Sequence, residues 1–219
     1  MKNRNRNFII SLVLIFLAIA FTIMVKLIDV KSIGANNTNI GFATLNELFF
    51  KSIGVNIVWY YITDWLGIIP ILMTFVYAII GLVQMIKRKR LFKVDKEILL
   101  LGLFYIILIA LYLFFEKVVV NYRPILMNGF LEASFPSSHT LMAVCICGSS
   151  IMINNKLYKN RMSKIVNILF YIIIIVTILG RLISGVHWLT DILGGVIISL
   201  ALLMTFYSVI HNIDDNKNN

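Results

Sequence analysis

The chain has 219 residues, of which 60% are hydrophobic and 14% charged, and its formal net charge is +10. A soluble domain of this size does not need so much apolar surface, whereas an integral membrane protein does. The positive charge does not indicate a nucleic-acid-binding protein, because the basic residues lie in short clusters between apolar runs. Cys145 and Cys147 stand two apart in one apolar run and point in different directions, which argues against a disulfide framework.

Six apolar runs are candidates for membrane-spanning helices. In chain order they are Phe8 to Val25, Trp65 to Ile86, Ile98 to Phe115, Thr140 to Asn155, Ile165 to Gly180 and Ile192 to Ile210. The first run resembles a signal peptide around Ala18-Ile-Ala20, but it continues to Val25, which favours a retained span over cleavage. The sequence therefore predicts an all-α protein, an integral membrane bundle of six transmembrane helices, with residues 1–219 forming a single domain.

Between the first two runs, residues Asp29 to Trp59 are too polar to cross a membrane. Phe42, Leu45, Phe49 and Ile53 recur there at helical spacing. This pattern fits an amphipathic helix lying on the membrane surface, and it fits an ordinary helix packed on the spans equally well.

The beginning of the second span carries two residues that affect its geometry. Pro70 is expected to kink the helix near its start. Asp64 precedes the apolar run, and we interpret it as an interfacial or helix-capping residue and not as a catalytic one.

The basic residues predict the orientation of the bundle. Fourteen of the 20 Lys and Arg residues lie in the N-terminal segment, the second and fourth connections and the C-terminal tail. The positive-inside rule therefore places both termini in the cytoplasm. It places a group of polar residues together at the outer face, namely Lys117, Arg123, His139, Arg181, His187 and Asp191.

These outer residues suit a phosphate ester. Arginine binds phosphate oxygens with paired donors and stabilises charge on a transferring phosphoryl group. Pro136-Ser-Ser-His139 begins a helix, whose free N–H groups and dipole favour an anion. Ser137 and Ser138 add hydroxyl donors, although a simple helix N-cap also explains them.

A metal-free reaction follows from the same residues. His187 and Asp191 stand four apart, so on a helix they share a face and can hydrogen-bond. His187 would attack phosphorus while Asp191 fixes its tautomer, and protonated His139 would donate a proton to the leaving oxygen. Nearby positive groups would repel a metal ion, so we predict a phosphohistidine intermediate and no cofactor. The alternative interpretation is that Arg181, His187 and Asp191 merely anchor a helix end.

Three segments together resemble the type 2 phosphatidic acid phosphatase superfamily of membrane phosphatases. Its pattern is Lys, six residues, Arg-Pro; then Pro-Ser-Gly-His; then Ser-Arg, five residues, His, three residues, Asp. The corresponding residues here are Lys117…Arg123-Pro124, Pro136-Ser-Ser-His139 and Gly180-Arg181…His187…Asp191. Three parts in order are a specific signal. The chain departs from the pattern at three places: Glu116 stands at the expected Lys position, Ser138 replaces Gly, and Gly180 replaces Ser.

The resemblance implies a lipid phosphatase, an enzyme surrounded by membrane lipids with no nucleic-acid partner. Its substrates would be lipids such as undecaprenyl diphosphate, phosphatidylglycerol phosphate or phosphatidic acid. The implied phosphate ligands are Lys117, Arg123, Ser137, the backbone of Ser138, and Arg181. The implied acid, nucleophile and orienting residue are His139, His187 and Asp191. Two alternatives remain: a phosphotransferase that passes the phosphoryl group to another acceptor, and a non-catalytic scaffold or transporter with a phosphate-binding site.

Overall fold

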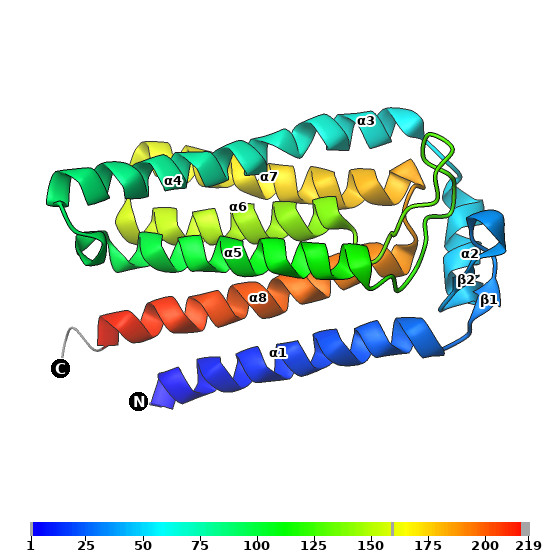
Figure 1. Ribbon diagram of the computed structural model, residues 1–219, viewed down its shortest axis with the longest axis horizontal. Helices are drawn as coiled ribbons and strands as arrows, with labels where there is room; N and C mark the ends of the chain where they lie inside the picture. The colour runs from blue at the N-terminus through cyan, green and yellow to red at the C-terminus, as the bar shows by residue number, and fades with distance from the viewer. Residues whose placement is uncertain (1, 159, 216–219) are drawn as a thin grey trace.

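Six helical segments in the computed structural model are long and apolar enough to cross a membrane, counted over the described residues, 2–158 and 160–215. They are α1 (Lys2–Leu27), α3 and α4 together (Ile57–Leu66 and Ile68–Arg88), α5 (Lys96–Lys117), α6 (Ser138–Leu157), α7 (Arg161–Ser184) and α8 (Leu189–Asp215). The helices run side by side along the bundle (Figure 1). The predicted all-α membrane bundle of six spans is confirmed, although the second span begins at Ile57 and not at Trp65.

The interior of the bundle is formed mainly by α6 and α8. Within the most apolar 18 residues of each span, 67% are buried in α6 and 50% in α8, against 17% in α1. Helix α6 is rich in small residues, among them Ala143 and Gly148, and a Cβ at Gly148 would lie 2.7 Å from a methyl group of Leu203 on α8. Small residues let membrane helices approach closely, so the sequence of α6 suits a central position.

The second span is broken where α3 meets α4. Helix α3 ends at Leu66 and α4 begins at Ile68, with Gly67 between them. Pro70 has no N–H to donate to the carbonyl of Leu66, four residues earlier, which accounts for the break. The expected effect of Pro70 is thus confirmed. The break lets α3 follow its own direction, and its first residues are tied to the end of α7 by a hydrogen bond from the Asn56 N–H to the Ser184 carbonyl (3.0 Å).

A shorter helix, α2 (Ala43–Ile53), crosses one end of the bundle (Figure 1). It follows a small antiparallel pair, β1 (Lys31–Ser32) and β2 (Asn39–Ile40), with the 3-10 turn η1 (Ala35–Asn37) between the strands. The buried Asn46 donates to the Thr190 hydroxyl (2.9 Å) and accepts from the Thr190 N–H (3.2 Å) at the start of α8. Helix α2 thus contacts the beginning of α8, while Leu45 and Leu48 on the same helix stay exposed, so both expected arrangements remain open.

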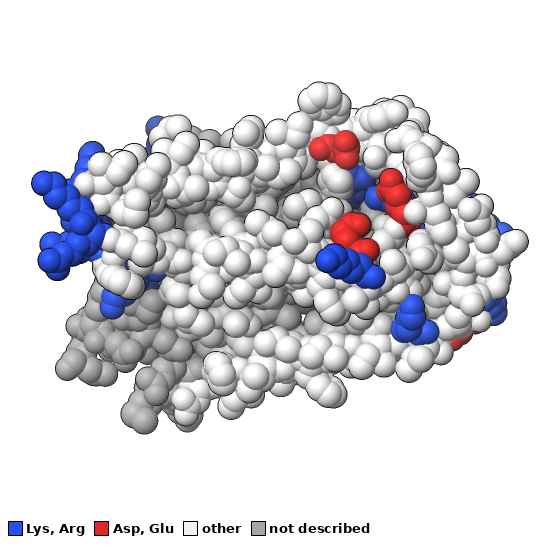
Figure 2. Space-filling view, in the orientation of Figure 1, with Lys and Arg blue, Asp and Glu red and all other residues white. Residues whose placement is uncertain are grey.

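Charged residues divide between the two ends of the molecule. Basic side chains gather where α4 leads through the 3-10 turn η2 (Leu91–Lys93) into α5, while acidic side chains surround a hollow at the opposite end (Figure 2). The second end holds α2, the connection from α5 to α6 and the connection from α7 to α8. Because the three sequence motifs lie in these connections and the adjoining helix ends, the structure gathers them at one end of the bundle.

Candidate active site

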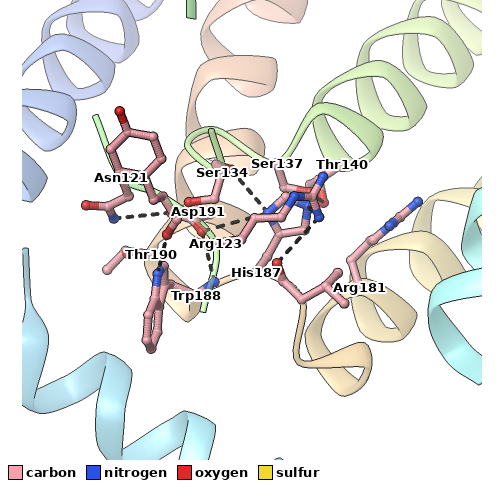
Figure 3. A network of polar contacts seen from close by, with 12 residues as sticks. Asn121, Arg123, Ser134, Ser137, Thr140, Arg181, His187, Trp188, Thr190 and Asp191 are labelled. Atoms are coloured by element: carbon pink, nitrogen blue, oxygen red, sulfur yellow. Dashed lines mark hydrogen bonds and ion pairs between the residues drawn. The ribbon is translucent and has the colours of Figure 1, made fainter. Parts of the chain in front are cut away.

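The site is built by two loops that are fastened to each other. The α5–α6 connection folds back on itself, with Tyr122 opposite Ala133 and a hydrogen bond from the Arg123 N–H to the Glu132 carbonyl (3.0 Å). The indole N–H of Trp188, in the α7–α8 connection, donates to the Tyr122 carbonyl (2.7 Å). These backbone contacts fix the relative positions of the side chains in Figure 3.

The tautomer of His187 follows from its two neighbours. Its Nε2 lies 3.4 Å from Nη1 of Arg123, and since a guanidinium only donates, Nε2 is the acceptor. Its Nδ1 then carries the proton and donates to the Ser134 carbonyl at 3.1 Å. Burial, assisted by the positive charges of Arg123 and Arg181, holds the pKa of His187 well below its ordinary value of 6.5. In the neutral imidazole of His187, the lone pair is thus on Nε2, where it accepts from Arg123.

Arg123 reaches His187 from the α5–α6 connection. Its Nη1 is also 3.5 Å from the Val186 carbonyl, and its Nε lies 3.0 Å from a carboxylate oxygen of Glu132. The ion pair with Glu132 means that this guanidinium is already partly neutralised before any ligand binds.

Asp191 approaches His187 from the beginning of α8. His187 precedes α8, so the two residues do not share a helix, and Nδ1 lies 3.8 Å from the nearer carboxylate oxygen. That carboxylate instead accepts from the Trp188 N–H (2.9 Å) and from the side-chain amide of Asn121 (3.3 Å). Asp191 thus holds the two loops together, and the Ser134 carbonyl is closer to Nδ1 of His187 than the Asp191 carboxylate is.

Ser137 and Ser138 mark the beginning of α6. Ser137 is fully buried, its hydroxyl accepts from that of Thr140 (3.1 Å), and its N–H donates to the Asp191 carbonyl (3.0 Å). Gly195 makes room for this segment, because a Cβ there would lie 3.1 Å from Thr140. The predicted helix start is confirmed, and it presents the free N–H groups of its first turn to the site.

Arg181 and His139 meet at a residue that we had interpreted as merely interfacial. One carboxylate oxygen of Asp64 lies 3.1 Å from Nη2 of Arg181 and 3.1 Å from Nε2 of His139. The ring of Tyr60 also stacks on the Arg181 guanidinium, 5.0 Å from its carbon. The interpretation of Asp64 is corrected: it belongs to the site, because the break at Gly67 lets α3 lean on α7.

Several buried donors lack a hydrogen-bond partner within the described part of the chain. At the site they include Nε and Nη1 of Arg181; Nδ1 of His139, whose Nε2 faces Asp64, also lacks a partner and becomes a donor when the ring is protonated. A buried donor without a partner costs about 1–3 kcal/mol, so these atoms favour an incoming group rich in acceptors. A phosphoryl group is such a group.

A cavity of about 410 Å³ lies on the His187 side of the site, and its lining includes Arg123, Ser138 and His187 but neither Arg181 nor His139. Glu116 also lines it, whereas Lys117 does not and is exposed at the end of α5. The structure thus differs from the expectation that Lys117 is a phosphate ligand. Successive residues of a helix point about 100° apart, so a shift of one residue turns Lys117 away from the cavity.

A sequence model of the PAP2 superfamily matches residues 115–215. Residues 115–215 are thus similar to the PAP2 superfamily. The matched PAP2 region includes all three motifs and ends with α8, whereas α1 to α4 lie outside it.

A known protein and a crystal structure are similar to this chain. Phosphatidylglycerophosphatase B of Bacillus subtilis (strain 168) is 30% identical over 93 residues, which are 42% of this chain and 44% of that protein. The match thus spans less than half of the relative's length. The crystal structure described as the first transmembrane PAP2 type phosphatidylglycerolphosphate phosphatase from Bacillus subtilis aligns over 98% of both chains, with a TM-score of 0.54 and 21% identity. The shared PAP2 fold therefore extends beyond the matched PAP2 region.

Four residues of the site escaped the sequence interpretation. Ser134 contacts His187 through its backbone oxygen, which every residue type has, so the sequence holds no signal for it. Asn121 lies two residues before Arg123 and Glu132 lies nine residues after it, so polar residues in the same connection as the motif were a usable signal. Asp64 is an ionisable residue at the edge of an apolar run, which is a functional candidate by default.

Proposed function

We propose that this chain is a membrane lipid phosphatase that hydrolyses a lipid phosphate or diphosphate through a phosphohistidine on His187. The observation that carries the proposal is the neutral imidazole of His187, whose Nε2 faces the guanidinium of Arg123 beside the 410 Å³ cavity. A lone pair beside fixed positive charge suits attack on an anionic phosphorus centre.

In the first step, Nε2 of His187 forms a bond to phosphorus while the bond from phosphorus to the lipid oxygen breaks. His139, in its protonated form, gives a proton to that oxygen, which leaves as an alcohol or as a lipid phosphate. Arg123, Arg181 and the first N–H groups of α6 stabilise the charge on the phosphoryl oxygens. The Ser134 carbonyl keeps the proton on Nδ1 of His187 throughout.

In the second step, water attacks phosphorus and the bond to Nε2 breaks. His139, neutral after the first step, accepts a proton from the attacking water and so returns to its starting form. Inorganic phosphate is released. None of these steps calls for a metal ion, and the described residues contain no group of three or more His, Cys, Asp or Glu side chains placed to hold one.

A lipid substrate is supported by the surroundings of His139. A cavity of about 230 Å³ beside Asp64 and His139 is lined by Ile71 and Met142. The same two residues line an apolar cavity of about 270 Å³ that continues between α4, α5 and α6. The two cavities form a track along which an acyl or prenyl tail can lie while its head group meets the two His residues.

The proposal also covers the class of lipid substrate and the orientation of the protein in the membrane. The relative's name points to phosphatidylglycerol phosphate, and undecaprenyl diphosphate and phosphatidic acid share its phosphate chemistry. The basic end of the bundle would face the cytoplasm with both termini, and the site would open at the outer face of the cell membrane. A phosphotransferase and a phosphate-binding scaffold or transporter are the competing functions.

The test uses purified protein in detergent with each of these lipids. We expect phosphate release, and His187→Ala should lower it at least about 10³-fold, because no other group replaces the nucleophile. His211→Ala is the matched control, since His211 stacks on Tyr207 far along α8. An acid-labile, alkali-stable phosphoryl adduct should be trapped in the wild type, and a chelator should leave the rate unchanged.

Each competing outcome is distinct. Full activity of His187→Ala rejects the nucleophile, and loss of activity on chelation rejects the metal-free route. Transfer of the phosphoryl group to a second lipid, with little free phosphate, identifies a phosphotransferase. Binding of lipid phosphates without turnover identifies the scaffold or transporter.

A further inference from the structure

Helix α3 lies outside the matched PAP2 region, yet it delivers a carboxylate to the centre of the site. A single oxygen of Asp64 is 3.1 Å from both Nε2 of His139 and Nη2 of Arg181. Tyr60, one turn earlier on the same face of α3, stacks on the same guanidinium. This helix therefore contacts the proposed proton donor and one proposed phosphate ligand at the same time.

The close approach of α3 depends on two glycines. A Cβ at Gly180 of α7 would lie 2.3 Å from Cγ2 of Thr63 and 3.0 Å from the Trp59 ring, so a side chain there would push α3 away. Gly180 stands where the family pattern has Ser. A Cβ at Gly67 would lie 2.9 Å from the His139 ring. The glycine at position 180, where the family pattern has Ser, thus leaves the space that lets α3 bring Asp64 into the site.

The contacts of Asp64 leave other donors for a substrate. Asp64 occupies Nε2 of His139, while Nδ1 of the same ring is buried without a partner in the described chain. It occupies Nη2 of Arg181, while Nη1 and Nε remain. A phosphate ester can therefore bind without displacing Asp64, its leaving oxygen against Nδ1 and its phosphoryl oxygens against Arg181.

We propose that Asp64 is a positioning residue for the phosphatase reaction, which orients His139 through Nε2 so that Nδ1 faces the leaving oxygen. The proposal rests on the proposed function. When the bond from phosphorus to the lipid oxygen breaks, the proton on Nδ1 moves to that oxygen, and the proton on Nε2 stays against the carboxylate. The charged and titratable groups around His139 are Arg181, Arg123, His187 and Asp64. Of these four, Asp64 alone is negative, so it offsets the guanidinium charges when the ring is protonated.

The test compares two substrates that differ only in the leaving group. One is a long-chain alkyl phosphate, whose alkoxide must be protonated as it leaves, and the other is a phenyl phosphate with the same alkyl tail, whose phenolate needs little help. In Asp64→Asn we expect kcat for the alkyl phosphate to fall about 10²-fold, as for loss of general acid catalysis. The loss for the aryl phosphate should be much smaller, and Asp64→Glu should restore part of the alkyl activity.

Glu47→Gln is the matched control, because Glu47 pairs with exposed Lys51 on α2 at the same end of the bundle. Thermal unfolding of each variant in detergent reports folding, and Asp64→Ser serves as a second replacement should the Asn variant fold poorly. Equal losses on both substrates would mean a structural role only. A lower KM with unchanged kcat would mean that the carboxylate competes with phosphate, and wild-type kinetics would mean no role. Each of these three results overturns the proposal while leaving the proposed function standing. A wild type that hydrolyses neither substrate overturns both.

Discussion

The residues before position 115 (the earlier part) and the matched PAP2 region (the later part) contribute very differently to the molecule. In the spans of the matched PAP2 region, α6, α7 and α8, 67%, 33% and 50% of the most apolar window is buried. In the preceding spans, α1, α3–α4 and α5, the shares are 17%, 11% and 28%. The later part has the larger buried share and nearly all the polar groups of the site, whereas most side chains of the earlier spans are exposed on the bundle surface, although α5 contributes several core residues. Asp64 is the exception, and it shows that the outer helices also shape the chemistry.

Among variants at the contact between α3 and the matched PAP2 region, the largest effect is expected at Arg181. Arg181→Ala removes donors aimed at the phosphoryl group and should lower kcat/KM by about 10²–10³-fold, measured by phosphate release from the lipid. Arg181→Lys should not restore it, because an ammonium cannot contact Asp64 and a phosphoryl group with the same planar set of donors. Recovery in the Lys variant would show that charge alone is needed.

An intermediate effect is expected when α3 is pushed away from α7. Gly180→Ser places a Cβ against Thr63 and should displace α3 and Asp64, lowering kcat about tenfold, the lower end of the range for mispositioned catalytic groups. Gly102→Ser on α5 is the matched control, since a Cβ there meets no heavy atom within 4 Å. Equal activity of the two variants would show that α3 does not need to pack so closely.

The pH dependence of kcat/KM tests the contact between His187 and Arg123, which lies wholly within the matched PAP2 region. In the proposed mechanism the neutral form of His187 reacts, and its lowered pKa keeps it neutral as the pH falls, so the acid limb of kcat/KM should lie below pH 6.5. The Arg123 charge contributes to that lowering, so Arg123→Gln should move the acid limb to higher pH as well as reducing the rate. If the acid limb of kcat/KM in Arg123→Gln stays at the wild-type pH, the Arg123 charge does not affect the pKa of His187.

The smallest effect is expected at Lys117. This exposed side chain lies outside the cavity lining, and exposed charges contribute little, so Lys117→Ala should change kcat/KM less than about twofold. Glu116→Gln is the informative companion, because Glu116 does line the cavity. A large loss in Lys117→Ala would restore the role that the family pattern assigns to a Lys at this position.

The spans and the grouping of the motifs could be predicted from the sequence, because both depend on hydropathy and on the order of charged residues. The kink at Pro70 was predictable for a local reason, the missing N–H. The neighbour of His187 was not, since spacing alone favoured Asp191 and the actual partner is a backbone oxygen. The place of Asp64 was not predictable either, because it depends on the space left by Gly180 on a distant helix.

The hydrogen bond between His187 and the main chain affects how such a protein can diversify. The proton on Nδ1 of His187 is held by the main-chain oxygen of residue 134, and every amino acid supplies that oxygen. Substitutions of side chains along this loop can therefore alter the cavity wall without disturbing the reactive ring, provided the backbone path is kept. Selectivity for one lipid head group over another can then change while His187, the proposed nucleophile, keeps its tautomer.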